Sequence, residues 1–152
     1  MKNAKFCIGW IKNPEDLPVP TEDEEQIALF DWAALQTGKY PELDNMFHIP
    51  NGGKRGKAEA GIFKAMGVKP GVSDVFLPAV RVMPCGGYIK YYSGLFIEMK
   101  RKTGGTVSAK QKDWLCKMRG AGYAAEVCEG WNQARKIILD YLERRYVPKY
   151  RP

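Results

Sequence analysis

Residues 93–128 read SGLFIEMKRKTGGTVSAKQKDWLCKMRGAGYAAEVC, and this stretch decides the fold. It predicts an apolar strand over residues 93–101, which the Thr103-Gly104-Gly105 sequence then breaks. Ser108 next caps a helix, and residues 123–128 form another strand. Because a strand, a helix and a strand in this order make a right-handed parallel crossover, the stretch predicts an α/β fold.

The sequence on either side of this unit predicts the surrounding elements. Thr21 and Glu24, three residues apart, form a capping box that opens the first helix. Prolines and glycines mark the turns between the other elements. The predicted elements are a helix from Thr21 to about Gln36, a helix from Lys57 to Met66, a strand from about Asp74 to Leu77, a hairpin arm or irregular excursion between Pro78 and Gly94 that returns the chain antiparallel to residues 93–101, the helix from Ser108 to about Ala121, and a last helix from about Asn132 to Arg145.

Together these elements predict an α/β domain in which a mixed central β-sheet is flanked by helices. The chain has 152 residues, which suits one compact core. We therefore expect a single domain over residues 1–152. Pro14, Pro18 and Pro20 predict that residues 1–20 are irregular.

Composition argues against several broad classes of protein. No apolar run approaches the roughly 20 residues needed to cross a bilayer, and the first residues lack an apolar region of signal-peptide length. We therefore expect a soluble, cytoplasmic protein with no membrane partner. Four cysteines without a Cys-x-x-Cys pair, and a single histidine, argue against structural zinc and favour reduced, packed thiols.

The net charge of +7 is unevenly distributed along the chain. Residues 21–50 hold seven acidic residues against one lysine, whereas residues 99–119 hold seven Lys or Arg against one Asp. A basic block of this kind attracts polyanions, and binding that neutralises phosphates weakens steeply with salt. A solvated basic face with no ligand is the alternative interpretation.

Two acidic residues and a lysine provide the main chemical signal. Side chains alternate across a strand, so Glu98 and Lys100 share one face while the apolar residues between and before them point to the other. Asp74 lies at another short strand upstream. If the two strands pair, its carboxylate comes close to that of Glu98.

This arrangement of an Asp with a Glu-x-Lys favours phosphodiester cleavage. Two carboxylates at about 4 Å repel by roughly 4 kcal/mol at an effective dielectric of about 20, and a bound Mg²⁺ or Mn²⁺ relieves the repulsion. The backbone carbonyl of Met99 can complete the metal shell, while Lys100 can direct its ammonium at the attacking water or the phosphate. An ordinary cross-strand salt bridge on a solvated face is the alternative.

Two further polar residues are candidates for the same site. Gln111 can reach back toward it from the first turn of its helix, although Ser108 and Gln111 also form a capping box. Glu22 shares a helix face with Gln26 and could supply a third carboxylate, although acidic residues in a first turn also suit the helix dipole. We expect three apolar residues of that helix in the core: Phe30, Trp32 and Leu35.

The single histidine lies in a segment that suits contact with phosphates. His48-Ile-Pro-Asn-Gly-Gly-Lys-Arg55 joins it to a glycine turn and a basic pair. A general base is a sharper interpretation of His48, and a local structural role is the plainer one. The candidate DNA-binding residues are His48, Asn51, Lys54, Arg55, Arg101, Lys102 and Lys110.

Several motifs in order resemble one known family. They are His48-Ile-Pro-Asn-Gly-Gly, Gly71-Val-Ser-Asp74, Gly94-Leu-Phe-Ile-Glu98-Met-Lys100, Ser108-x-x-Gln111-x-x-Trp114 and Gly122-Tyr, followed by a closing helix. This combination resembles the stand-alone VRR-NUC domain of bacteriophages, within the PD-(D/E)XK superfamily of restriction-endonuclease-like folds. The resemblance covers about residues 21–142. Ser73 departs from it, since proline is common before the aspartate.

The resemblance implies a metal-dependent, structure-selective DNA endonuclease, similar in fold to Holliday junction resolvases and expected to be a homodimer. By motif match, Asp74, Glu98 and Lys100 take the catalytic roles with Mg²⁺ or Mn²⁺. Gln111 matches the family's glutamine at the start of the following helix, and Glu22 with Gln26 matches the Glu and Gln of the first helix. Such a protein encoded by a phage would work in the cytoplasm of the host cell.

Two other functions remain open from the sequence. One is a DNA-binding module of the same fold that does not cut, although the Asp74, Glu98 and Lys100 set argues against it. The other is a metal-dependent phosphoesterase acting on small substrates, against which the basic block favours a long polyanion.

Overall fold

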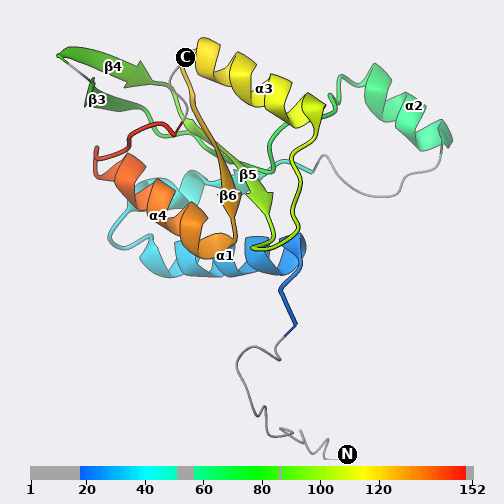
Figure 1. Ribbon diagram of the computed structural model, residues 1–152, viewed down its shortest axis with the longest axis horizontal. Helices are drawn as coiled ribbons and strands as arrows, with labels where there is room; N and C mark the ends of the chain where they lie inside the picture. The colour runs from blue at the N-terminus through cyan, green and yellow to red at the C-terminus, as the bar shows by residue number, and fades with distance from the viewer. Residues whose placement is uncertain (1–17, 51–56, 86, 150–152) are drawn as a thin grey trace, which may run out of the picture.

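The computed structural model describes residues 18–50, 57–85 and 87–149. Helices and strands are mixed along this length, and four strands follow one another between α2 and α3 (Figure 1). In chain order the elements are α1 (Glu22–Gln36), the 3-10 helix η2 (Pro41–Asn45), β1 (Phe47–His48), α2 (Lys57–Ala65), β2 (Val75–Leu77), β3 (Arg81–Cys85), β4 (Tyr88–Tyr92), β5 (Leu95–Lys100), α3 (Ala109–Gly120), β6 (Ala124–Glu129) and α4 (Trp131–Leu142).

The central sheet has the strand order β1-β2-β5-β6. β5 pairs antiparallel with β2, where Val75 lies opposite Ile97, and parallel with β6, where Leu95 lies opposite Ala124. Figure 1 shows α3 on one side of β5 and β6, with α1 and α4 on the other. The predicted mixed sheet flanked by helices is therefore confirmed, including the parallel pair joined through α3.

Capping boxes begin both helices that border the end of β5. The Glu24 N–H donates to the Thr21 hydroxyl at 3.2 Å, and the Thr21 N–H donates to the Glu24 carboxylate at 2.8 Å. At α3 the Gln111 N–H donates to the Ser108 hydroxyl at 3.3 Å, and the Ser108 N–H donates to the Gln111 side-chain carbonyl at 2.8 Å. Both boxes lie where the sequence predicts them, so the two helix starts are fixed locally.

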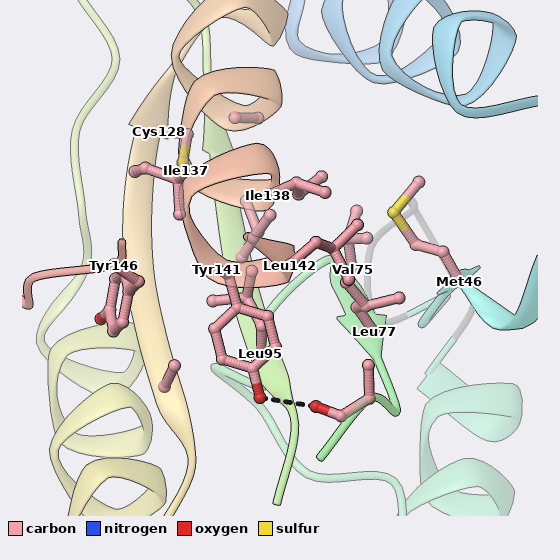
Figure 2. Packing of buried hydrophobic residues seen from close by; sticks show 14 of the residues in the cluster. Met46, Val75, Leu77, Leu95, Cys128, Ile137, Ile138, Tyr141, Leu142 and Tyr146 are labelled. Atoms are coloured by element: carbon pink, nitrogen blue, oxygen red, sulfur yellow. Dashed lines mark hydrogen bonds between the residues drawn. The ribbon is translucent and has the colours of Figure 1, made fainter. Parts of the chain in front are cut away.

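The main core lies between the sheet and the pair α1 and α4. Figure 2 shows Ile138, Tyr141 and Leu142 of α4 packed against Val75 and Leu95 of the sheet. The hydroxyl of Tyr141 is buried there and donates to the backbone carbonyl of Ala79 at 2.6 Å (Figure 2). A smaller cluster fills the opposite face, under α3, and contains Phe96, Leu115 and Ala125.

One prediction about the core is wrong. Leu35 is 83% exposed, whereas Phe30 and Trp32 pack against the core as partly buried residues. The buried stripe of α1 runs through Leu29 and Ala33. Leu35 is six residues after Leu29, about 240° around the helix, and so faces solvent.

The chain between β2 and β5 forms the predicted hairpin, but apart from the central sheet. β3 and β4 pair antiparallel in a two-stranded sheet of their own, from Arg81 opposite Tyr92 to Cys85 opposite Tyr88. The sequence did not predict η2 or the two-residue strand β1. Both are short, and only the pairing of β1 with β2 distinguishes it from a loop.

Residues 1–17 and 51–56 lie outside the described residues, so the predicted irregular N-terminal segment stays a prediction. In the described part of the chain, no helix combines the length and the hydrophobicity that crossing a membrane requires.

A close backbone approach joins the loop before β2 to the start of α3. A Cβ added at Gly71 would lie 2.6 Å from the backbone carbon and oxygen of Lys110, and the φ of Gly71 is +85°. Gly67 has a φ of +92° but open space around the same position. Comparing the two glycines therefore distinguishes the cost of backbone strain, which both share, from the cost of steric contact, which only Gly71 has.

We predict that Gly71→Ala destabilises the protein more than Gly67→Ala. Both substitutions impose the cost of a positive φ, on the order of 1 kcal/mol, but only Gly71→Ala also forces α3 away from the loop, a further cost of about 1–3 kcal/mol. Urea unfolding of the two variants measures the difference. Equal losses of unfolding free energy would show that the close approach contributes nothing.

Candidate active site

The antiparallel pairing of β2 with β5 brings Asp74 to Glu98. Val75 lies opposite Ile97, so Asp74, one residue earlier, lies opposite Glu98 on the same face of the sheet. The Asp74 carboxylate accepts a hydrogen bond from the backbone N–H of Met99 at 2.8 Å. Register and hydrogen bonding thus hold two carboxylates side by side at the end of β5.

Lys100 completes a three-residue cluster with these carboxylates. Its Nζ donates to Glu98 Oε1 and to the Met99 carbonyl, both at 2.8 Å. Glu98 is 0% exposed and Lys100 is 4% exposed. The alternative of an ordinary salt bridge on a solvated face is therefore excluded, because this ion pair is buried.

Glu22 and Gln111 approach the cluster from two different helices. Glu22, the first residue of α1, places Oε2 3.5 Å from the Nζ of Lys100. The side-chain amide of Gln111 donates to Glu98 Oε1, while its carbonyl caps α3. Gln111 thus combines the capping role and the site role that the sequence left as alternatives.

Burial and mutual repulsion shift the acid–base properties of the two carboxyl groups. Burial raises the pKa of Glu98 to about 7; hydrogen bonding to Lys100 opposes the shift and the charge of Asp74 adds to it. Burial also raises the pKa of Asp74, against the hydrogen bond from Met99. Both carboxyl groups therefore ionise less readily than in water, because the positive charge near them does not offset their burial.

Lys100 keeps its charge in spite of its surroundings. Burial by itself lowers the pKa of this lysine, but the hydrogen bond to Glu98 and the nearby carboxylate charges outweigh it, and the net pKa is raised. Lys100 is therefore an ammonium at neutral pH, suited to donating hydrogen bonds and not to accepting a proton.

The residues present suit a hard divalent cation that is partly coordinated by other molecules. Among the described residues, no group donates a hydrogen bond to the buried Oε2 of Glu98. Asp74, Glu98 and the Met99 carbonyl supply oxygen atoms only, which Mg²⁺ and Mn²⁺ prefer. Within the described ranges, however, no three His, Cys, Asp or Glu side chains are gathered as a metal cage. Mg²⁺ commonly binds through one or two carboxylates together with water and substrate phosphates.

Two cavities of opposite character meet at Glu22. The first has a volume of about 380 Å³ and is mainly acidic; the second has a volume of about 530 Å³ and contains Lys100 and Arg101. The first is lined by Glu22, Asp23, Gln26, His48, Pro50, Asp74 and Met99, and the second by Thr21, Glu22, Lys100, Arg101, Gly104, Gly105, Thr106 and Gln111. Asp23 was not predicted at the site, because four consecutive acidic residues open α1 and helix-dipole stabilisation accounts for any of them.

His48 has a structural contact as well as a place in the acidic cavity. Its Nδ1 lies 2.8 Å from the backbone carbonyl of Asp74. A carbonyl only accepts, so Nδ1 carries the proton and donates. This hydrogen bond supports the local structural role of His48. The general-base interpretation is supported only by the position of His48 in the acidic cavity.

The other candidate DNA-binding residues divide into two groups. Arg101, Lys102 and Lys110 are exposed along the loop from β5 to the start of α3. Asn51, Lys54 and Arg55 lie outside the described residues, so their role stays a prediction.

Comparison with known proteins gives the class. The family model of the VRR-NUC domain matches residues 21–132. A solved structure of a VRR_NUC domain protein aligns with a TM-score of 0.68 at 29% sequence identity, covering 84% of this chain and 93% of that chain. The search of curated proteins found no match.

The fold and the match together define a nuclease-type domain, whose partner is DNA. The chain belongs to the VRR-NUC domain family. The family resemblance predicted from the motifs is therefore confirmed, and the fold class with it.

The raised pKa of Glu98 predicts how metal-free stability depends on pH. The folded state holds this proton more tightly than the unfolded state, so the free energy of unfolding falls as pH rises from about 4.5 to about 7. Ionisation of Glu98 alone should cost on the order of 1–3 kcal/mol. Glu98→Gln removes the titrating group and should make the decline smaller.

Urea unfolding in EDTA at pH 5 and pH 8 measures this difference. Glu129→Gln, which removes an exposed carboxylate at the end of β6, is the control and should keep the wild-type profile. If the Glu98→Gln and wild-type profiles coincide, burial of Glu98 does not destabilise its ionised form.

Proposed function

We propose that the chain is a metal-dependent, structure-selective endonuclease that hydrolyses phosphodiesters of branched DNA, such as Holliday junctions, with Mg²⁺ or Mn²⁺ as cofactor. One observation carries the proposal. The buried carboxyl group of Glu98 and the partly buried one of Asp74 lie beside a charged Lys100, at the border of two open cavities.

The two neighbouring carboxyl groups favour cutting over mere binding. Withdrawing carboxyl groups from water is costly, and a non-cleaving module gains nothing from placing them where DNA phosphates would lie. A divalent cation, when bound, supplies Lewis acidity that makes water nucleophilic near neutral pH and offsets phosphate charge. Asp74, Glu98 and the Met99 carbonyl would hold it.

The chain's other groups orient the reactants. Lys100, held by Glu98 and the Met99 carbonyl, would donate to the scissile phosphate or orient the attacking water. Gln111 holds Glu98, and Glu22 attracts the Lys100 ammonium. No covalent intermediate is needed, because water is the nucleophile.

Exposed basic residues favour a long polyanion over a small substrate. Arg101 lines the basic cavity, Lys102 lines a neighbouring pocket, and Lys110 is exposed at the start of α3. Exposed basic residues of this kind neutralise backbone phosphates and carry no readout of base sequence. Selection of DNA by shape is therefore part of the proposal.

We also propose that two copies of the chain form a homodimer. A four-way junction presents two equivalent strands, so a two-fold symmetric enzyme can place one site on each. Light scattering of the purified protein measures the oligomeric state.

Cleavage of a panel of junctions, flaps, nicks and plain duplexes identifies the preferred substrate. If no DNA of this panel is cleaved with Mg²⁺ or Mn²⁺, the alternative of a DNA-binding module that does not cut is favoured.

We predict that Lys100→Ala lowers cleavage on the order of 10²–10³-fold, because a donor aimed at developing phosphate charge is lost. Retention of DNA in a gel shift should change little. Lys117→Ala is the matched control, since Lys117 pairs with Asp113 on the exposed side of α3 and its loss should leave cleavage intact. Equal loss of cleavage and retention in Lys100→Ala would make Lys100 a contact residue only.

We predict that Lys110→Ala makes the negative slope of log affinity against log salt less steep by about 1, because one phosphate contact is lost. Titration of branched DNA between 50 and 200 mM salt, by fluorescence anisotropy, measures the slope. Lys136→Ala on α4, where the lysine pairs with Asp140, is the control and should keep the wild-type slope. A salt response that is flat for the wild type would favour the small-substrate alternative.

A further inference from the structure

Glu25 is a buried acidic residue that neither the metal site nor the DNA interface uses. It is 1% exposed and lies on the buried stripe of α1, four residues before Leu29. In the described part of the chain it forms no ion pair with a lysine or arginine, and its Oε1 is buried without a hydrogen-bond partner. Burying a carboxylate in this way is costly, so a compensating interaction is expected.

That interaction comes from the N-terminus of α4. Glu25 Oε2 accepts a hydrogen bond at 2.7 Å from the backbone N–H of Trp131, the first residue of α4. The N-cap of α4 is Gly130, which has no side chain to satisfy the free N–H groups of the first turn. Glu25 therefore caps α4 from another helix and places its charge at the positive end of the helix dipole.

Gly130 allows this contact and also connects it to Lys100. A Cβ added at Gly130 would lie 3.1 and 3.2 Å from the two carboxylate oxygens of Glu25, and the φ of Gly130 is +80°. The N–H of Gly130 donates to the backbone carbonyl of Lys100 at 2.7 Å. Consecutive hydrogen bonds thus join α1, the start of α4 and the end of β5.

Glu22 lies one turn before Glu25 on α1. Residues three apart share a helix face, so fixing Glu25 against Trp131 also fixes the orientation of Glu22. Glu22 Oε2 lies 3.5 Å from Lys100 Nζ. The capping box of Thr21 and Glu24 fixes only the local start of α1, because both of its partners belong to α1.

We infer that Glu25 is a positioning residue, which ties the first turns of α1 to the end of β5 and so holds Glu22 at Lys100. The inference rests on the proposed function for its effect on cleavage, but the tie between α1 and α4 is independent of it. Glu25 thereby acts through Glu22 and touches neither substrate nor metal.

The experiment combines Glu25→Ala, Glu25→Gln and Glu22→Gln in a double-mutant cycle, with Asp31→Asn as an exposed control on α1. Glu25→Ala should lower kcat about 10–100-fold, with KM for DNA largely kept. In the Glu22→Gln background the same substitution should have little further effect. Glu25→Gln keeps an oxygen that accepts from the Trp131 N–H and should recover part of the activity.

A second measurement needs no activity and no metal. Hydrogen exchange of the Trp131 amide and of residues 24–30, followed by NMR in EDTA, should be faster in Glu25→Ala than in Asp31→Asn. The inference is wrong if exchange in Glu25→Ala is the same as in Asp31→Asn. It is also wrong if Glu25→Ala lowers kcat by the same factor in the wild-type and the Glu22→Gln backgrounds. If the wild type does not cut DNA, the proposed function fails while the exchange measurement still decides the tie. If Glu25→Ala does not fold, the cycle and the exchange are measured with Glu25→Leu, which fills the same buried space and removes the oxygen that accepts from the Trp131 N–H.

Discussion

The buried ion pair between Glu98 and Lys100 organises the end of β5 and the segments around it. An ion pair out of water needs hydrogen bonds to its polar atoms, and among the described residues only the Oε2 of Glu98 in this pair lacks one. Here the Met99 carbonyl accepts a hydrogen bond from the Lys100 ammonium, Gln111 donates to Glu98, and the Met99 N–H donates to Asp74. These bonds connect the end of β5 to the start of α3 and to the residue before β2.

Local rules predicted those parts of the site that depend on neighbouring residues. Strand alternation placed Glu98 and Lys100 on one face, and capping-box spacing placed the helix starts at Thr21 and Ser108. Pairing of the Asp74 strand with β5 was left as a condition by the sequence, and the structure shows it. Each of these inferences needs only the geometry of one element or of two adjacent strands.

Features that depend on packing between distant segments were not predictable in the same way. Glu25 reads like any acidic residue in a first turn, and only the position of α4 shows that it is buried. Leu35 reads like a core residue, but the stripe through Leu29 and Ala33 turns it toward solvent. Burial of Glu98 requires α3 to cover the strand, which alternation cannot reveal.

Under the proposed function, the two cavities restrict how DNA approaches. Glu22, Asp23 and Asp74 make the smaller cavity repel phosphate, whereas Lys100 and Arg101 make the larger one attract it. The backbone is therefore drawn in along the loop from β5 to α3, and a phosphate reaches the carboxylates only at the border. A cation held there by Asp74, Glu98 and the Met99 carbonyl would lower this repulsion, and it would thereby help to place the scissile phosphate as well as supply Lewis acidity.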